Sequence, residues 1–288
     1  MKARSYFYII SAAALWGLIG LFVKMLAAQG FTSMQIVALR SLASAVCATL
    51  LLCRLGLHHL RIRWRDAWLF VGTGICSLVF FNYCYFNCMQ QSSLAVAALL
   101  LYTAPIFVML LSLLLFGESF SLRKGVSLVC TFIGCACVTG AFSSGLTLTL
   151  SSLLYGLGSG VGYALYSIFG KYAVQKYSSL TITAYTFYFA LAAVPLAGFD
   201  QAALARLDLT SVLCSLGLGL VCAVIPYILY TKGLELVEPG QASILATVEP
   251  FVAAAVGMLF FSEPLTFSKA CGMLLIFSSI VILNLPKK

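Results

Sequence analysis

The sequence predicts an all-α integral membrane protein whose ten transmembrane helices form two inverted five-helix repeats. Three observations indicate this fold: an apolar composition, ten long apolar segments and an internal repeat. Hydrophobic residues make up 62% of the 288 positions and charged residues only 9%, whereas soluble domains contain roughly 45–50% and about 25%. So few charges cannot cover the surface of a soluble protein of this size. Most of the outer surface must therefore face hydrocarbon.

The apolar segments have the length of membrane-crossing helices, which need about 20 mostly apolar residues. They lack the apolar–polar alternation of barrel strands. The first segment resembles a signal peptide, but it contains Trp16 and Lys24 and no small-residue cleavage site follows it, so we expect it to be retained. Read in order between charged or turn-rich breaks, the predicted spans are 6–27, 32–54, 67–88, 93–115, 122–141, 151–173, 180–199, 210–232, 240–261 and 267–285.

Basic residues are divided unevenly between the two ends of these spans. With the N-terminus in the cytoplasm, thirteen Lys and Arg residues lie at cytoplasmic ends and three at the opposite ends, while Arg40 lies within a span. Such an excess orients a membrane protein. It predicts a multi-pass protein of the cell membrane (inner or plasma membrane) with both termini cytoplasmic. Because the same distribution accounts for the net charge of +9, we expect no nucleic-acid partner.

The second half of the chain repeats the first, and we call the aligned residues counterparts. A shift of 147 residues aligns Trp16 with Tyr163, Phe22 with Phe169 and Lys24 with Lys171. Later in each half the shift is 145, because the connector between the second and third spans changes length. It aligns Gly72, Gly74, Tyr85, Pro105, Phe116, Glu118 and Lys124 with Gly217, Gly219, Tyr230, Pro250, Phe261, Glu263 and Lys269.

Each half contains five predicted spans, so the second half enters the membrane from the opposite side. We expect a first repeat over 1–141, a linker over 142–150 and a second, inverted repeat over 151–288. Inverted repeats are typical of alternating-access transporters, whose substrate sites lie near the bilayer midplane. The alternative is that duplication only builds a stable bundle.

Two charged residues lie near the middle of predicted spans. Arg40 is the ninth residue of the second span and Glu249 the tenth of the ninth span. A centred charge costs roughly 2.5–3.5 kcal/mol, so a mutual salt bridge would lower both penalties. The two residues form a candidate intramembrane charge pair. A substrate partner or proton site is the functional interpretation, and a pair that only locks two helices is the alternative.

Three prolines predict breaks in spans. Pro105 and Pro250 are counterparts in the fourth and ninth spans, and Pro226 lies in the eighth. Proline removes a backbone donor and bends a helix, and in a bilayer the freed groups must face protein or a water-filled cavity. The paired breaks therefore point to a central cavity, although a simple packing kink is the alternative for any one of them.

Aromatic and amide side chains occur at matched depths in the two halves. Tyr227 and Tyr230 share a helical face, as do their counterparts Asn82 and Tyr85. Rings with hydrogen-bonding tips suit an organic solute that has an apolar body and a few polar groups, whereas interfacial aromatic belts are the alternative for tyrosines at span ends. The candidate substrate-binding residues are Trp16, Asn82, Tyr85, Tyr102, Tyr163, Tyr166, Tyr227, Tyr230 and Glu249.

Signatures of other protein classes are missing from the sequence. It contains no Walker, kinase, hydrolase or HExxH motif, and its eleven cysteines lie in or beside apolar spans without a CxxC pair. We therefore expect no enzymatic activity, no cofactor and no metal. Because the length leaves no room for ATP-binding domains, any energy would come from ion or solute gradients.

Two blocks of the sequence resemble the EamA-like family of the drug/metabolite transporter superfamily. The blocks run from Ala104-Pro105-Ile106 to Phe116-Gly117-Glu118 and from Glu249-Pro250-Phe251 to Phe261-Ser262-Glu263, each followed by a Lys and a final span. One departure is Ser262, where the first block has Gly117. The resemblance implies ten helices, cytoplasmic termini, a central cavity formed by the inner helices, and usually efflux of amino acids or other metabolites.

These observations favour a secondary-type transporter that exports small organic metabolites, such as amino acids, by alternating access around a midplane cavity. Its expected partners are the solute, the lipid bilayer and a proton or counter-solute, and we expect a monomer or a homodimer. One alternative is exchange or uptake of a phosphorylated or nucleotide-linked solute. That function would favour several basic residues in the cavity, and only Arg40 is deep enough. A membrane receptor or scaffold is the other alternative.

Overall fold

The computed structural model describes residues 2–56, 60–141, 149–199 and 201–284. Most of the linker predicted at 142–150 therefore lies outside the described residues. Within these ranges all regular elements are helices, as the sequence predicts. The first half contains α1 (Lys2–Trp16), α2 (Ile19–Ala28), α3 (Ser33–Leu55), η2 (Trp64–Asp66), α4 (Ala67–Val71), η3 (Gly72–Val79), α5 (Phe80–Gln91), α6 (Leu94–Leu101), α7 (Ala104–Phe116) and α8 (Leu122–Thr139).

The second half follows the same course. It contains α9 (Leu150–Ala173), α10 (Ser179–Ala190), η4 (Leu191–Ala193), η5 (Pro195–Ala197), α11 (Gln201–Ala205), α12 (Leu209–Gly219), η6 (Leu220–Val224), α13 (Ile225–Leu234), α14 (Pro239–Leu245), α15 (Val248–Phe261) and α16 (Phe267–Asn284). The starts of several helices are fixed by hydroxyl or carboxylate side chains that accept a backbone N–H, at Thr32, Ser121, Thr149 and Asp208.

Eight stretches of the described chain are long and apolar enough to cross a membrane. They are Ala3–Ala28, Ser33–Leu55, Trp64–Gln91, Leu94–Phe116, Leu122–Thr139, Leu209–Leu234, Pro239–Phe261 and Phe267–Asn284. The other two predicted spans, 151–173 and 180–199, correspond to the 24-residue helix α9 and to the shorter apolar stretch Ser179–Ala193. The chain is therefore a multi-pass helical membrane protein.

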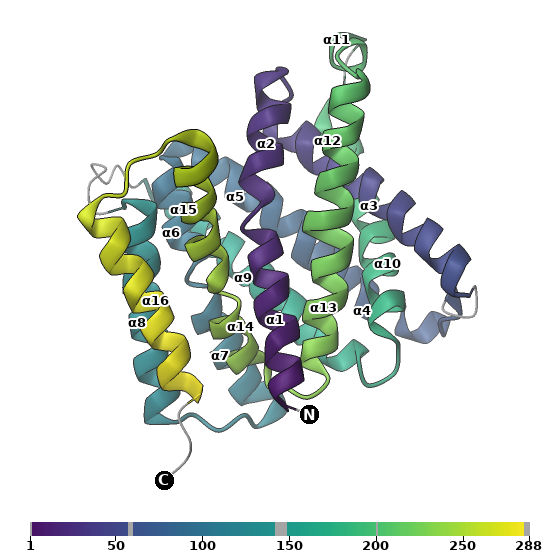
Figure 1. Ribbon diagram of the computed structural model, residues 1–288. Helices are drawn as coiled ribbons and strands as arrows, with labels where there is room; N and C mark the ends of the chain where they lie inside the picture. Colours follow the sequence, from purple (N-terminus) through teal and green to yellow (C-terminus); the bar gives the residue numbers. More distant parts are fainter. Residues whose placement is uncertain (1, 57–59, 142–148, 200, 285–288) are drawn as a thin grey trace.

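The helices form one bundle in which elements of the two halves alternate (Figure 1). Helix α1 packs against α13 while α9 packs against α5, and α7 and α8 pack against α14 and α16. The start of α1 and the end of α16 lie at the same end of the bundle, the lower end in Figure 1. We call this end the terminal side and the other end the opposite side.

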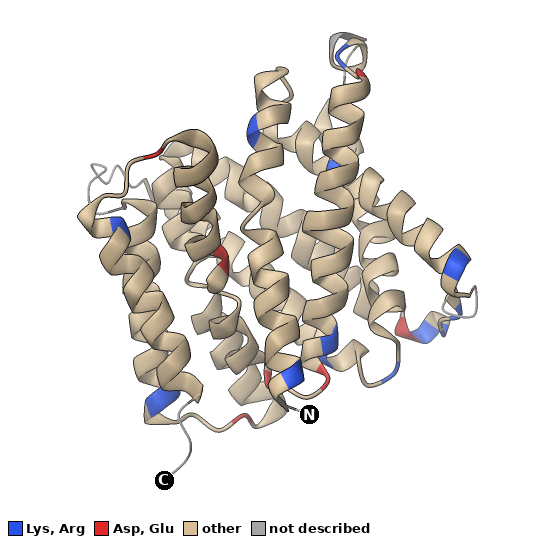
Figure 2. Ribbon diagram, viewed as in Figure 1, with Lys and Arg blue, Asp and Glu red and all other residues tan. Residues whose placement is uncertain are grey.

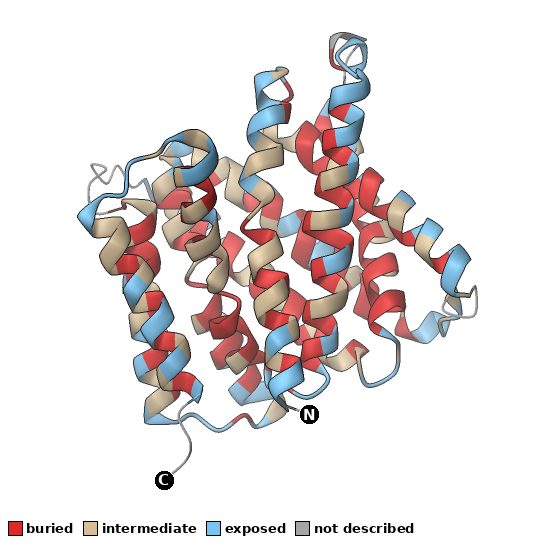
Figure 3. Ribbon diagram, in the orientation of Figure 1, coloured by how far each residue is buried: buried red, intermediate tan, exposed pale blue. Residues whose placement is uncertain are grey.

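Buried residues lie on the inward faces of the helices, and exposed residues lie on their outward faces and at the ends of the bundle (Figure 3). Large apolar side chains are widely exposed on the outside, for example Leu114 at 75%, Leu259 at 80% and Phe267 at 86%. Such apolar exposure is far beyond what a soluble monomer carries. It fits a surface that is covered by lipid acyl chains.

Two π-helical segments interrupt counterpart spans. They are η3 (Gly72–Val79) and η6 (Leu220–Val224). A β-carbon on Gly72 would lie 2.4 Å from the Phe169 ring, and one on Gly217 would lie 2.5 Å from the Phe22 ring. Since Phe22 and Phe169 are themselves counterparts, each half inserts the same phenylalanine against the same glycine of the other half.

Ser262, which stands where the first half has Gly117, has a strained backbone conformation. Ser262 ends α15 with φ at 52°, and its counterpart Gly117 ends α7 with φ at 62°. The left-handed conformation costs a residue with a β-carbon roughly 1–2 kcal/mol. Beyond its chain neighbours, no atom of the described residues lies within 4 Å of a β-carbon built on Gly117, so a substitution there would change only the backbone energetics.

We therefore predict that Ser262→Gly raises the free energy of unfolding by about 1 kcal/mol and that Gly117→Ser lowers it by about the same amount. Both changes act on the same backbone conformation in opposite directions. Denaturant titrations of the two variants in detergent micelles would measure the effect. A neutral Gly117→Ser variant would contradict this explanation.

Candidate functional site

A cavity of about 390 Å³ lies inside the bundle. This volume falls within the range of about 300–1,000 Å³ found for small-molecule sites. It reaches toward the opposite side, where Lys24 on α2 and Ser33 at the start of α3 line it. Its wall is mainly apolar and comes from α2, α3, α5 and α6, with Leu218 of α12 and Glu249 of α15. The polar groups on the wall are therefore few and distinct.

All nine candidate substrate-binding residues line this cavity or one of two small cavities that share lining residues with it. Asn82, Tyr85, Tyr102 and Glu249 line the main cavity. Tyr102 and Glu249 also line a space of about 10 Å³ together with Tyr163, Pro105 and Thr247. Trp16, Tyr163, Tyr166, Tyr227 and Tyr230 surround a space of about 20 Å³. The structure thus brings together side chains from both halves of the chain.

The two intramembrane charges face the same cavity without direct contact. The Arg40 Nη2 donates to the Cys222 carbonyl at 3.2 Å, and its buried Nε has no hydrogen-bond partner in the part of the chain that the structure describes. The Glu249 carboxylate faces the Tyr163 hydroxyl. No Arg40–Glu249 salt bridge within 4 Å is found in the described chain, so the charges act on each other only across the cavity. A cation with an unbonded donor and an anion therefore line the same cavity.

An aromatic cluster closes the cavity toward the terminal side. The Trp16 ring lies 5.4 Å from Tyr227 and 5.3 Å from Tyr230 between ring centroids, and Tyr166 lies 4.7 Å from Tyr227. The hydroxyls of Tyr166 and Tyr230 bond to Thr231 and Ser167 at 2.8 and 2.7 Å. The buried Trp16 Nε1 has no hydrogen-bond partner among the described residues. Tight ring packing leaves room here for about one water molecule.

The three prolines lie at interruptions of the helices. Pro105 lies in the first turn of α7, after a break at Tyr102 and Thr103 that separates α6 from α7. Pro250 lies in the first turn of α15, after a matching break at Ala246 and Thr247. Pro226 follows η6 at the start of α13. The first two breaks face each other across the 10 Å³ space.

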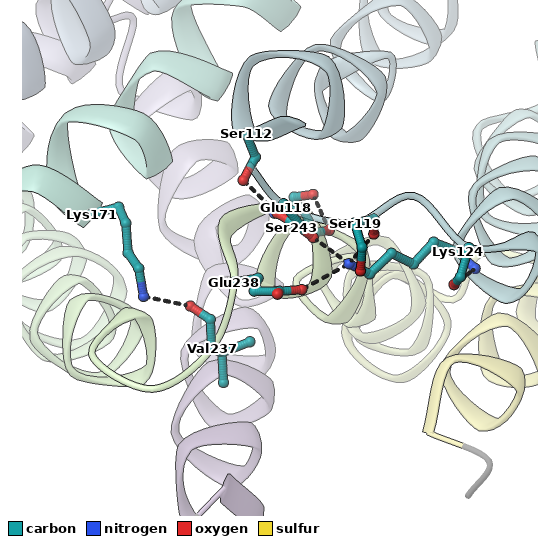
Figure 4. A network of polar contacts seen from close by, with 10 residues as sticks. Ser112, Glu118, Ser119, Lys124, Lys171, Val237, Glu238 and Ser243 are labelled. Carbon is teal, nitrogen blue, oxygen red and sulfur yellow. Dashed lines mark hydrogen bonds and ion pairs between the residues drawn. The ribbon is translucent and has the colours of Figure 1, made fainter. Parts of the chain in front are cut away.

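A buried polar network seals the terminal side (Figure 4). The Glu118 carboxylate, whose side chain is 1% exposed, accepts from Lys124 Nζ at 2.9 Å, from the Gly240 N–H at 3.0 Å and from the Ser112 hydroxyl. Lys124 also binds Glu238 at 2.7 Å. The network therefore joins the α7–α8 connection of the first half to the start of α14 in the second half.

Lys171 strengthens the same closure from α9. Its ammonium donates to the carbonyls of Leu234 and Val237 at 2.5 and 3.0 Å, at the end of α13 (Figure 4). These bonds hold the α13–α14 connection against α9. The path from the cavity to the terminal side is thus blocked by aromatic rings and then by buried charges.

The counterpart residues on the opposite side form an exposed ion pair. Charges gather at the two ends of the bundle in Figure 2, and here Glu263 pairs with Lys24 at 3.1 Å and with Lys269 at 3.0 Å. The Glu263 side chain is 39% exposed, compared with 1% for Glu118. Hydrogen bonds from Lys269 and Lys24 lower the Glu263 pKa. The ion pair of Glu263 is therefore exposed on the opposite side, whereas that of Glu118 is buried on the terminal side.

The sequence does not predict several residues of the site. The cavity wall includes Ile19, Val37, Phe86 and Met89, which look like ordinary lipid-facing or core residues in a sequence this apolar. Gly240, which donates to Glu118, and Glu238, which pairs with Lys124, come from a distant segment of the chain. In the sequence, only the repeat alignment of Glu118, Lys124 and Lys171 singles out members of this network.

Comparison with known proteins identifies relatives of this chain. The family model described as the EamA-like transporter family matches residues 3–140 and 150–285. An uncharacterized transporter of Archaeoglobus fulgidus is 32% identical over 69% of the chain and 70% of its own length. The uncharacterized transporter YwfM of Bacillus subtilis is 25% identical over 100% and 97%, and the uncharacterized inner membrane transporter YicL of Salmonella typhimurium is 23% identical over 97% and 95%.

A solved crystal structure of a protein shares this fold. It superimposes with a TM-score of 0.80 over 99% of the chain and 98% of its own length, at 18% sequence identity. At this identity the likeness concerns the fold alone. The helical arrangement that surrounds the cavity is therefore one that a chain of quite different sequence also adopts.

Proposed function

Because the chain belongs to the EamA-like transporter family, we propose that it exports small organic metabolites, such as amino acids, by alternating access around the central cavity. One observation carries the proposal: a cavity of about 390 Å³ reaches one side of the bundle and is sealed from the other. Arg40 and Glu249 on its wall can attract a charged solute and still leave the cavity volume free for it. The chemistry of the wall is that of a binding site for one small molecule.

The arrangement of charges favours a solute that carries both a cation and an anion. The free Nε of Arg40 is a donor for a carboxylate, and Glu249 is an acceptor for an ammonium group. Ile19, Val37 and Phe86 offer an apolar surface to the remainder of the solute. A zwitterion with an apolar side chain satisfies all three features, because it pairs with both charges on binding.

We further propose that the chain crosses the cell membrane ten times as two inverted repeats and that its terminal side faces the cytoplasm. The support comes from reciprocal contacts. Phe22 meets Gly217 as Phe169 meets Gly72, and α1 packs on α13 as α9 packs on α5. Pairs of this kind arise when two related halves are joined by a twofold axis in the membrane plane.

Alternation follows if the two halves exchange their conformations. In the present state Glu118 is buried and its counterpart Glu263 is exposed. Exchange would bury Glu263 on the opposite side and expose Glu118 on the terminal side. Lys171 would then pair with Glu118, as its counterpart Lys24 pairs with Glu263 now. The solute would meet the same Arg40 and Glu249 from the cytoplasmic side, which gives export a structural path.

The direct test is transport by purified protein in liposomes loaded with a ¹³C-labelled mixture of amino acids, sugar phosphates and nucleotides. We expect mass spectrometry to find selective loss of zwitterionic solutes, with protein-free liposomes as the control. Loss of sugar phosphates or nucleotides instead would support the alternative of a phosphorylated or nucleotide-linked solute. No loss of any solute would contradict transport and favour a receptor or scaffold.

A further inference from the structure

A second, separate cleft lies on the terminal side, away from the transport cavity. It has a volume of about 470 Å³ and is lined by Arg61, Ile62, Arg63, Asp66, Lys176 and Tyr177. These residues come from the segment before α4 and from the connection between α9 and α10. Three cations and one carboxylate give the cleft an excess of two positive charges.

The acidic residue of the cleft already has its partners. Asp66 accepts from Lys176 Nζ at 2.6 Å and from the Tyr177 hydroxyl at 2.7 Å. The Tyr177 oxygen accepts the Arg63 N–H at 3.0 Å and so joins the two segments. The side chains of Arg61 and Arg63 make no ion pair or hydrogen bond with any described residue. These bonds therefore join the two segments that line the cleft, and they do not involve the guanidinium groups of Arg61 and Arg63.

An exposed tryptophan lies between these arginines and the membrane-crossing helix. Trp64 is 87% exposed, and Trp68, four residues later, is 50% exposed. Tryptophan prefers the boundary between headgroups and acyl chains. The span Trp64–Gln91 begins at this residue, so the cleft lies at the headgroup level. A free anion would make no use of the Trp64 indole beside the cleft, whereas the acyl chains of a lipid would contact that indole.

We propose that this cleft binds the phosphate of an anionic phospholipid, with Arg61 and Arg63 as its ligands and Trp64 against the acyl chains. Guanidinium groups bind phosphate oxygens with two parallel hydrogen bonds. The site is independent of the transport cavity, because the two share no lining residue. The lipid would tie the α3–α4 connection to the α9–α10 connection through Lys176 and Tyr177.

Trp64 provides a direct assay, because brominated acyl chains quench indole fluorescence on contact. A Trp68→Phe protein, in which only Trp64 and the buried Trp16 remain, is reconstituted into phosphatidylcholine vesicles containing phosphatidylglycerol. Either the phosphatidylglycerol or an equal amount of phosphatidylcholine is brominated. We expect quenching to report at least about a tenfold preference for phosphatidylglycerol, from about 1 kcal/mol per basic residue at the surface.

Arg61→Gln with Arg63→Gln is expected to abolish the preference. Arg4→Gln with Lys232→Gln, which removes two other cations of the terminal side near Tyr8, is expected to retain it. Arg61→Lys with Arg63→Lys should keep part of it, since the charges remain. An unchanged preference in the double Gln variant would overturn the proposal.

Discussion

Replacing Glu249 by glutamine is expected to lower the transport rate by about 10- to 100-fold, because a hydrogen bond to a charged partner contributes about 1.5–3 kcal/mol. Glutamine has nearly the shape of glutamate, so the cavity wall and its contact with Tyr163 stay in place. Only the negative charge is lost, and with it the attraction for an ammonium group. The measurement is counterflow of the labelled solute identified in the liposome assay.

The matched control is Glu235→Gln, which removes a carboxylate at the terminal end of α13, outside the cavity. We expect it to transport at the parental rate, because within the described chain the Glu235 carboxylate has a single hydrogen bond, a long one of 3.4 Å from the Ser179 hydroxyl. If Glu249→Gln also keeps the parental rate, Glu249 does not bind the solute. Imposing a pH gradient on the same vesicles separates solute binding from proton coupling, since an unchanged rate dismisses coupling.

Replacing Lys124 by methionine is expected to lower the free energy of unfolding by about 3–5 kcal/mol, the cost of breaking a buried ion pair from one side. The Glu118 side chain is 1% exposed and would keep its charge in a site without a cation. Its other donors, the Gly240 N–H and the Ser112 hydroxyl, cannot neutralise that charge. Denaturant titration in detergent micelles measures the loss.

Lys269→Met is the matched control, since Lys269 is the counterpart of Lys124 and pairs with the half-exposed Glu263. There we expect a loss of no more than about 1 kcal/mol. Adding Glu118→Gln to Lys124→Met should recover much of the stability, because it removes the unpaired charge. Equal losses at Lys124 and Lys269 would contradict the assignment of a sealed terminal side. If Lys171 forms an ion pair with Glu118 in the Lys124→Met protein, adding Lys171→Met will lower the free energy of unfolding further.

Much of the fold could be predicted from local properties of the chain. Apolar runs of sufficient length predict spanning helices because hydrocarbon requires every backbone group to bond within its own segment. The stretch 151–173 is less apolar than the other predicted spans because α9 contains serine, tyrosine and glycine residues, and yet this helix is 24 residues long. The broken courses of the fourth and ninth spans followed from Pro105 and Pro250, because proline has no N–H to donate.

The candidate site was predictable in its residue types but not in its geometry. Repeat alignment and mid-span position singled out nine side chains that line the main cavity or the spaces beside it. The apolar wall residues could not be found, since Val37 or Phe86 has nothing in sequence to distinguish it from a residue facing lipid. Nor could the sequence predict that Arg40 bonds the Cys222 carbonyl instead of Glu249.

The sequence by itself determined that this chain is a helical membrane protein and which of its residues are counterparts, because hydropathy and duplication are properties of neighbouring residues and of their order. Its tertiary structure alone decided which side of the cavity is closed. Glu118 and Glu263 occupy equivalent positions in nearly identical motifs, and yet one is buried and the other exposed. That difference depends on how two halves pack against each other, and no local pattern encodes it.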